Sequence, residues 1–432
     1  MERLMQYVWQ HRLWLTGDML TVDGERVEVL DPGLLNTDAG PDFFNAKIRI
    51  GDREWAGNVE IHVKASDWKR HGHDRDAAYD SVILHVVYTD DCRISRPDGQ
   101  LIPQLVLRCA ADFNAKYRSM VDTAADLPCS SLISELPAIY LSDWLTSLAL
   151  ERLFDKADRV YSLVERHNMD WYEAIYIVLA RGLGFSTNSD AFERLAMSIP
   201  LRYMLRHQGA YETVEGALFG MAGFLDGCDT GSATEDNYKH NLLREYRFFT
   251  AKYGLEAPKS LGWKMARMRP QNFPHRRLAL LASIIADGFS IGRNILAVRD
   301  VDDAKRLFNC YPTHFWRSHY TFCPTSAAES AKLGIGSIMS LIINVVVPVM
   351  YSYGTHHGIE ELKHRAVELL ENIPPENNRI VRQFIEAGVN CPDAFSSQAL
   401  IQLRRNYCEP RKCLYCRIGH RLLASRALLR NQ

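Results

Sequence analysis

One short segment places three ionisable side chains on the same face of a strand whose other residues are apolar. In "NVEIHVK", residues 58–64, valine and isoleucine alternate with Glu60, His62 and Lys64. Because successive side chains of a strand point to opposite faces of a sheet, these three share one face. Charged groups within a sheet are costly to bury unless they are paired or hold an ion. We therefore predict that Glu60, His62 and Lys64 belong to a functional site.

A second carboxylate can join this face from the preceding strand. Asp42 follows Pro41, and seventeen residues separate it from Glu60. If the two strands pair antiparallel about a turn at residues 51–53, Asp42 comes close to Glu60. Two carboxylates with a basic group beside them suit a hard divalent cation, Mg²⁺ or Mn²⁺. Such an ion would activate a water and stabilise a phosphoryl transition state, so Asp42 and Glu60 are the predicted metal ligands.

The same residues resemble the signature of the PD-(D/E)xK nucleases. In that family an Asp and a Glu bind Mg²⁺, and a Lys two residues after the Glu positions or deprotonates the attacking water. Asp42, Glu60 and His62 match this order, with His62 at the position of the Lys and Lys64 two residues later. The resemblance implies that the two acids bind the metal, and it leaves His62 and Lys64 as alternatives for the water. It also implies a helix after the strand, for which residues 65–80 have room for only a short one.

A histidine-rich stretch downstream offers a different metal site. His71, His73 and His85 follow His62, with several aspartates among them. Imidazole and carboxylate groups together suit Zn²⁺, Mn²⁺ or Fe²⁺. A metal hydrolase acting on a small substrate is therefore a second hypothesis for this region. The alternative, in which these residues have no functional role, is a solvated loop with His85 as a hydrogen-bonded histidine in the core.

Four of the ten cysteines crowd the last tenth of the chain: Cys391, Cys408, Cys413 and Cys416. We predict that they bind Zn²⁺ or an iron–sulfur cluster, because ligation by sulfur alone suits both. A closed four-ligand site mostly stabilises the fold, so the expected role is structural. Four buried, reduced thiols without a metal are the alternative. A chain of this size without a secretory signal usually keeps its thiols reduced, which indicates a cytoplasmic location.

Two segments are rich in basic residues and hold few acids. The first contains Lys264, Arg267, Arg269, Arg276 and Arg277, and the second contains Arg404, Arg405, Arg411 and Lys412. Basic side chains next to aromatic rings are typical of surfaces that bind a nucleic-acid backbone. The net charge of −1 does not itself predict such a partner, so nucleic-acid binding rests on these two patches. The alternative is that acidic residues elsewhere in the fold balance them.

The secondary-structure elements predicted to hold these residues are strands in the N-terminal part of the chain and helices after it. Residues 26–109 contain five short β-branched or alternating runs separated by turn signals, which predict a mostly antiparallel sheet. From about residue 136 the apolar residues follow a helical period. We predict an α+β protein. Its parts are a nuclease-like β-rich domain at 1–127, a linker at 128–137, an all-helical domain at 138–390, and a basic cysteine tail at 391–432 packed on the helices.

One segment, residues 333–355, contains no charged side chain and is long enough to span a bilayer. Its glycine, serine and asparagine residues and Pro348 favour a buried central helix that is kinked near the proline. We therefore expect no membrane-spanning segment. With 432 residues, 47% of them apolar and 24% charged, the composition is that of a globular protein. The sequence leaves the oligomeric state open.

Over nearly its full length the chain resembles a bacterial family catalogued as domain of unknown function 2851. The resemblance rests on segments such as "LNTDAGPDFFNAKI" and "MRPQNFPHRRLALLA" and on the cysteine tail, and it carries no known activity. Our first hypothesis is a cytoplasmic, metal-dependent nuclease. The alternatives are a nucleic-acid-binding scaffold with a degenerate nuclease fold, and the hydrolase of a small substrate.

Overall fold

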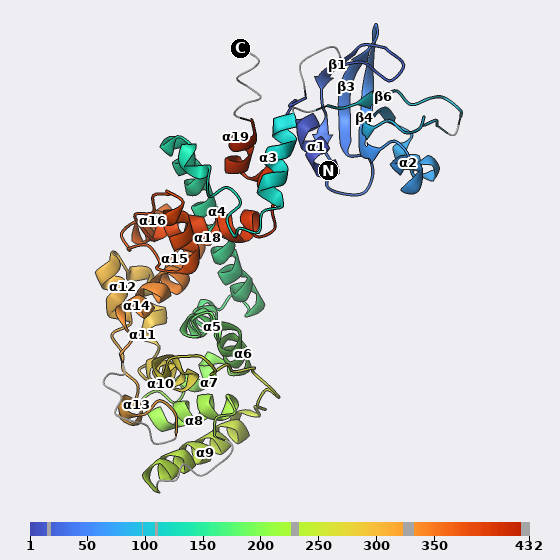
Figure 1. Ribbon diagram of the computed structural model, residues 1–432. Coiled ribbons are helices and arrows are strands. Elements are labelled where there is room, and N and C mark those ends of the chain that lie inside the picture. The colour runs from blue at the N-terminus through green and yellow to red at the C-terminus, as the bar shows by residue number, and fades with distance from the viewer. Residues whose placement is uncertain (15–18, 97, 109–110, 226–232, 323–331, 425–432) are drawn as a thin grey trace. The chain divides into compact units, whose positions relative to one another are not determined.

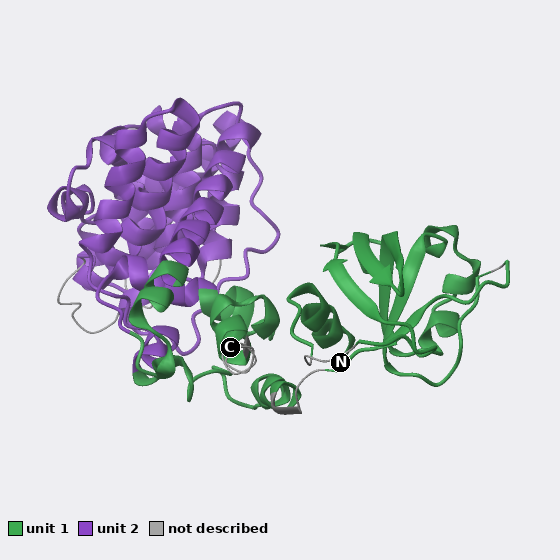
Figure 2. Ribbon diagram, turned by 90° about the horizontal axis from the view of Figure 1, so that it is seen from above, with its two compact units in different colours: residues 1–144, 386–389, 403–432 green, residues 145–385, 390–402 purple. Residues whose placement is uncertain are grey.

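The chain forms two compact units (Figures 1 and 2). The computed structural model describes residues 1–14, 19–96, 98–108, 111–225, 233–322 and 332–424. Unit 1 comprises residues 1–144, 386–389 and 403–432, and unit 2 comprises residues 145–385 and 390–402. The boundary therefore falls inside a long helix and not in the predicted linker. The predicted tail is also divided, because most of it belongs to unit 1 and not to the helical unit.

Within the described residues, unit 1 is built on a six-stranded mixed sheet (Figure 1). Its strands are β1 (Val27–Asp31), β2 (Leu34–Leu35), β3 (Phe43–Ile50), β4 (Arg53–Lys64), β5 (Val82–Thr89) and β6 (Gln104–Val106). β1, β2 and β4 pair antiparallel with β3, whereas β5 pairs parallel with both β4 and β6. The five predicted strands are present, with β2 as a short addition. A sheet in the N-terminal part and a larger helical part after it confirm the predicted α+β class.

The parallel pairing of β4 with β5 requires the chain to cross over the sheet between them. This crossover, residues 65–81, holds the short helix α2 (Asp67–Arg70) and two 3₁₀ turns. By contrast, β3 and β4 are antiparallel neighbours and need only a tight turn at residues 51–52. The longer crossover brings His71 and His73 back toward the strand that carries Glu60.

Strand β4 is buried on both faces in its C-terminal half. Val59 and Ile61 have no exposed surface, and the helix α1 (Glu2–Gln10) packs against the strand. Glu60 and His62, on the opposite face, are only 5% and 1% exposed. The face that alternation predicts to be polar is therefore not solvated, and its carboxyl group needs partners inside the protein.

The remainder of unit 1 is helical and comes from two distant parts of the sequence. It includes α3 (Ala111–Val121), the first turns of α4 (Ala138–Arg166) and α19 (Arg417–Ala424). A π-helical turn at Arg404–Cys408 and a 3₁₀ turn at Cys413–Tyr415 precede α19. The last of these turns and α3 both pack against α19.

The described residues of unit 2 form helices joined by loops around an extensive apolar core. After most of α4 they are α5 (Trp171–Leu183), α6 (Ser189–Ser198), α7 (Leu201–Leu205), α8 (Tyr211–Met221), α9 (Ala233–Tyr253), α10 (Pro274–Ala286), α11 (Ser290–Asn294), α12 (Val301–Leu307), α13 (Phe315–Ser318), α14 (Ile335–Leu341), α15 (Val347–His357), α16 (Glu360–Glu371), α17 (Arg379–Glu386) and α18 (Ala394–Leu403). α10 is buried at every position and lies at the centre of this core.

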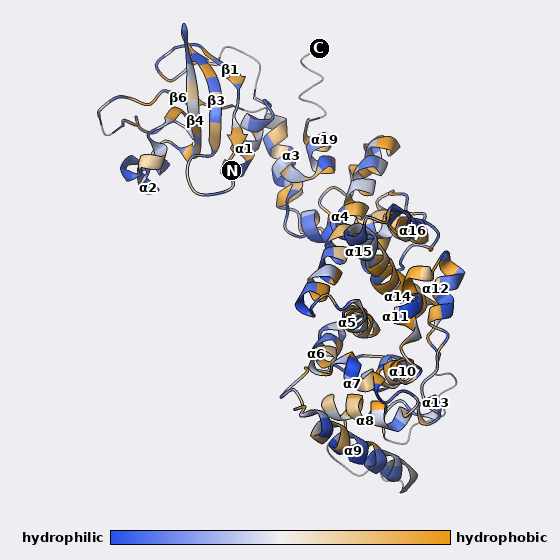
Figure 3. Cartoon of the chain, turned by 180° about the vertical axis from the view of Figure 1, so that it is seen from behind, coloured by the Kyte–Doolittle hydropathy of each residue, from blue (hydrophilic) through white to orange (hydrophobic). Residues whose placement is uncertain are grey.

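The uncharged segment forms one continuous helix, Ile335–His357, whose first part, α14, is predominantly apolar (Figure 3). A π-helical stretch at Ile342–Val346 ends two residues before Pro348, a residue that has no N–H to donate to the turn before it. The predicted kink itself stays a prediction. By length and composition the helix could cross a bilayer, as could Pro274–Ala286 and Ser290–Ala297 taken as one bent pair. However, 56% of its apolar window is buried, as in the core helix of a globular protein.

The packing of α8 against α9 depends on a glycine. A Cβ at Gly220 would lie 2.1 Å from two ring atoms of Tyr246. We expect Gly220→Ala to lower the free energy of unfolding by about 1–3 kcal/mol, the usual cost of overpacking. Gly336→Ala is a matched control in α14, where an added Cβ meets nothing within 4 Å and alanine favours the helix. Urea unfolding measures both variants, and equal midpoints would contradict the predicted clash.

Candidate functional site

Asp42 and Glu60 are held together where the start of β3 lies beside the C-terminal half of β4, at the end of the pair away from the turn. The backbone N–H of Asp42 donates to Oε2 of Glu60 at 3.0 Å, and the N–H of Ile61 donates to Oδ2 of Asp42 at 3.0 Å. The amide of Gln6 on α1 donates to Oδ1 of Asp42 at 2.8 Å. The structure thus brings the two predicted acids together. Both oxygens of Asp42 accept hydrogen bonds from the protein, so Asp42 also fixes the position of Glu60.

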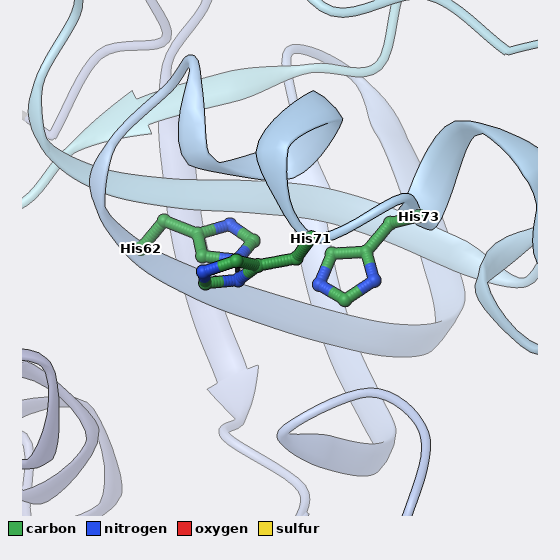
Figure 4. Close-up of side chains that lie close together, drawn as sticks. All are labelled: His62, His71 and His73. Carbon is green, nitrogen blue, oxygen red and sulfur yellow. Dashed lines mark hydrogen bonds between the residues drawn. The ribbon is translucent and has the colours of Figure 1, made fainter.

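The other carboxylate oxygen of Glu60, Oε1, faces histidines. Its Oε1 lies 3.4 Å from Nε2 of His62 and 3.3 Å from Nε2 of His73. Nε2 of His62 also lies 3.2 Å from Nδ1 of His71. We call His62, His71 and His73 the histidine cluster (Figure 4); one nitrogen from each lies within 4.8 Å of the other two. The three imidazoles therefore converge on one point, and Oε1 of Glu60 lies beside two of them, His62 and His73.

The crossover after β4 sets the directions of His71 and His73. Gly72 between them has φ of 79°, a left-handed conformation that favours glycine and turns the chain sharply. The ring of His73 stacks on Tyr79 with 3.8 Å between centroids and meets Trp68 edge to face. His73 is thereby held in place, whereas His71 is exposed and leaves one side of the cluster open to solvent.

A chain of hydrogen bonds fixes the tautomer of His62. The amide nitrogen of Gln104 donates to Asp90 at 2.5 Å, so its oxygen is left to accept from Nδ1 of His85 at 3.2 Å. Nε2 of His85 then accepts from Nδ1 of His62 at 2.9 Å. This assignment, made from the hydrogen-bond network, gives Nε2 of His62 a lone pair that faces both Glu60 and Nδ1 of His71. A metal-binding histidine is usually oriented through its other nitrogen in this way.

Burial shifts the pKa values of these groups in the direction that favours their neutral forms. It lowers the pKa of His62 to about 2 and that of His85 to about 4. Burial, with the neighbouring Asp42, raises the pKa of Glu60 to about 9, and burial raises that of Asp42 to about 6. The lone pair of His62 and the oxygen of Glu60 both accept, so a positive centre must lie between them. That centre is either a proton or a metal ion.

Three imidazoles, with a carboxylate beside two of them, offer donors for a transition-metal ion. Zn²⁺ and Fe²⁺ bind imidazole nitrogen readily, and Mn²⁺ accepts mixed nitrogen and oxygen ligands, whereas Mg²⁺ prefers oxygen alone. The structure therefore shifts our expectation from Mg²⁺ to Mn²⁺, Zn²⁺ or Fe²⁺. Glu60, His62, His71 and His73 would be the ligands, with His85 orienting His62.

Lys64 lies apart from this point. It is the last residue of β4, and its side chain is exposed. There its charge acts on the carboxylate of Asp91. Of the two alternatives for the lysine of the nuclease signature, His62 is therefore the one that faces Glu60.

Three of the four predicted cysteines lie together in the structure. Cys408, Cys413 and Cys416 lie together around a small cavity in unit 1, but the fourth cysteine that lines it is Cys129. Cys391 belongs to unit 2, where its sulfur lies 3.9 Å from the carbonyl oxygen of Asp393. Sequence reasoning missed Cys129 because it follows Pro128 in the predicted linker, far from the other three.

The first basic segment divides into surface and core. Lys264, Arg267 and Arg269 are exposed in the loop before α10. Arg276 and Arg277 are only 6% and 7% exposed within α10, and their guanidinium groups lie over the rings of Tyr320 and Phe185. These two arginines were wrongly assigned to a nucleic-acid surface.

The second basic segment divides in the same way. Arg405 and Lys412 are exposed. Arg404 is buried and pairs with Asp126 at 3.2 Å, and a guanidinium nitrogen of Arg411 donates to the carbonyl oxygens of residues 123 and 125. Arg404 and Arg411 therefore hold the fold of unit 1, which corrects their prediction as nucleic-acid contacts.

A large cavity in unit 2, lined by polar and apolar side chains, has no counterpart in the sequence prediction. It encloses about 1190 Å³ between α8, α9 and the segment that leads into α13. Glu215 on its wall is fully buried and accepts hydrogen bonds from Tyr238 and Thr313. Burial raises the pKa of Glu215 to about 7. No local signal distinguishes Glu215 from the exposed acids of other helices.

Mn²⁺ binding to unit 1 should strengthen as the pH rises toward about 9. Below the raised pKa of Glu60 the metal must displace its proton, which costs about tenfold in affinity per pH unit. His62 and His73 add no such cost, because burial lowers their pKa values. Titration calorimetry at pH 6, 7 and 8 measures the slope.

Glu60→Gln should bind Mn²⁺ more weakly and without this slope, whereas His364→Ala, an exposed histidine of α16, should bind as the wild type does. An unchanged slope in Glu60→Gln would contradict the assignment of the displaced proton.

One protein family matches the chain by its sequence model. Described as Protein of unknown function (DUF2851), it covers residues 2–379, which include the histidine cluster and Cys129 but not Cys408, Cys413 and Cys416. No curated protein and no solved structure matches significantly, so the resemblance to PD-(D/E)xK nucleases stays a prediction. Because the match covers most of the chain, the protein belongs to the DUF2851 family.

Proposed function

We propose that unit 1 is a metal-dependent hydrolase of phosphodiesters, with nuclease activity as the first expectation. One observation carries this proposal: Oε1 of Glu60 faces Nε2 of both His62 and His73 at 3.3–3.4 Å in a buried setting. Oε1 of Glu60 and the unprotonated Nε2 of His62 both accept hydrogen bonds, so a proton or a metal ion must lie between these two atoms. A functional metal explains the arrangement better than a structural proton does, because His71 leaves the cluster open to solvent.

Each residue has a distinct role in this proposal. Glu60 and the histidine cluster would hold the ion, which when bound would activate a water and stabilise the charge that develops on the phosphoryl oxygens. His85 orients His62 and keeps its Nε2 free of a proton. Asp42 is a positioning residue, since its N–H holds the second oxygen of Glu60.

The order of elements supports a phosphodiester substrate. Asp42 stands directly before β3, Glu60 lies within β4, and the short helix α2 follows β4, which is the order that the nuclease resemblance implies. Exposed basic residues are also present, namely Arg405 and Lys412 in unit 1 and Lys264, Arg267 and Arg269 in unit 2. They supply positive charge of the kind that binds a phosphate backbone.

A hydrolase of a small substrate is the second candidate, and the three convergent imidazoles favour it, because histidine-rich centres are common among such enzymes. The non-catalytic scaffold is less well supported. It rests on the two basic segments, and four of their nine residues are buried or bonded within the fold.

The test is cleavage of single- and double-stranded DNA and RNA, and of bis-(p-nitrophenyl) phosphate, with Mn²⁺, Zn²⁺ or Mg²⁺. We expect His62→Ala and Glu60→Gln each to lose at least about hundredfold in rate, since even outer-shell changes cost 10–100-fold. Glu54→Gln is the matched control, because Glu54 is an exposed carboxylate on the same strand.

The outcomes separate the three hypotheses. Cleavage of nucleic acid that depends on Glu60 and His62 supports the nuclease. Cleavage of the small ester alone, with the same dependence, supports the second candidate. Activity that survives both variants, or a pure wild-type protein inactive with every metal, would overturn the proposed site.

A further inference from the structure

Four cysteines from separate parts of the chain meet inside unit 1. Cys129, Cys408, Cys413 and Cys416 are each 6–7% exposed and line one small cavity together with Gly419. None of the four is in a disulfide. Burial raises the pKa of every one of these thiols, to about 12 for Cys129, and the neighbouring sulfurs add to the effect in Cys129, Cys408 and Cys413. Four buried thiols around one small cavity call for a chemical reason.

The surrounding backbone is built to bring these sulfurs together. Arg411 adopts a left-handed conformation with φ of 55° in the turn between Cys408 and Cys413, and its guanidinium group holds the carbonyl oxygens of residues 123 and 125. A Cβ at Gly419 would lie 2.0 Å from the carbonyl oxygen of Cys413. Glycine is therefore required where α19 approaches this turn.

The backbone also offers donors to a thiolate. The N–H groups of Ile418 and Gly419, at the start of α19, point at the sulfur of Cys416 and favour its ionised form. Donors directed at a buried sulfur stabilise a negative charge there. Metal-bound thiolates carry such a charge and are tuned by hydrogen bonds of this kind.

The spacing of the sulfurs favours a cluster over a single ion. Four sulfurs at about 2.3 Å from one Zn²⁺ would lie only about 3.8 Å from one another. Among the described residues, no three of these sulfurs lie within 4.8 Å of each other, whereas three nitrogens of the histidine cluster do. An iron–sulfur cluster distributes four cysteines over several irons and so fits a wider arrangement.

We propose that Cys129, Cys408, Cys413 and Cys416 ligate an iron–sulfur cluster that ties the C-terminal segment of unit 1 to residues 123–129. On binding, each thiol gives up its proton and forms one bond to iron. The role is structural, because the ligand set is closed and the sulfurs are buried. This site is separate from the proposed hydrolase and does not rest on it.

The first test is the metal content of the full-length wild-type chain purified without oxygen. We expect about two or four irons with an equal number of acid-labile sulfides per chain, and broad visible absorption. Zinc without iron would overturn the cluster, and the absence of both metals would overturn the site.

Two variants test the choice of ligands. Cys129→Ser should lose the iron, whereas Cys391→Ser, which changes the cysteine outside this cavity, should keep the full amount. The reverse result would overturn the assignment of Cys129.

A chemical measurement keeps the test independent of whether Cys129→Ser folds. Alkylation of native wild-type protein, followed by peptide mass analysis, should show the four cysteines protected until a chelator removes the iron. Cys391 should react to the same extent before and after. Equal reactivity of Cys129 in both states would also overturn the proposal.

Discussion

The arrangement of unit 1 depends on one buried carboxyl group, that of Glu60. An ionised carboxylate without a partner in the interior costs several kcal/mol, so the surrounding residues must supply donors or a cation. Asp42 supplies a backbone N–H to one oxygen, and His62 and His73 face the other. Each of these partners is held in turn, Asp42 by α1 and His73 by the ring of Tyr79. The hydrogen bonds and ring contacts around Glu60 thus extend to α1, β5 and the crossover.

The mixed sheet is what makes this convergence possible. An antiparallel hairpin would have joined β4 to the next strand by a tight turn and left no chain to cover the polar face. The parallel pairing instead places residues 65–81 between β4 and β5, and this segment carries His71 and His73. The same pairing sets His85 opposite Glu60 in register, where it can orient His62. The strand topology is therefore what brings this donor set together.

Sequence alone predicted what local periodicity controls and missed what tertiary packing controls. The alternation in β4 identified Glu60 and His62, and the hairpin identified Asp42. The alternation failed for Lys64, because the last residue of a strand is not buried as its neighbours are. Composition suggested that Arg276 and Arg277 form a surface, yet their helix is buried at every position. Clustering in sequence favoured Cys391 and gave no sign of Cys129, which lines the cavity although it lies some 280 residues before the other three cysteines. Gln104, which sets the tautomer of His85, carried no signal because its role exists only through the parallel pairing of β6 with β5.

The first helix connects the two polar centres of unit 1. Adjacent residues of α1 face them separately: Gln6 donates to Asp42 beside Glu60, and the hydroxyl of Tyr7 is hydrogen-bonded to His420 on α19. His420 lies one helical turn after Cys416, and its N–H donates to the carbonyl oxygen of Cys416 at 2.8 Å. Ligation of the four sulfurs, as proposed, would restrain α19 and, through Tyr7, the helix that holds Asp42 against Glu60. Because a few tenths of an ångström decide whether donors converge on one ion, the cysteine centre can support the histidine cluster without contacting it.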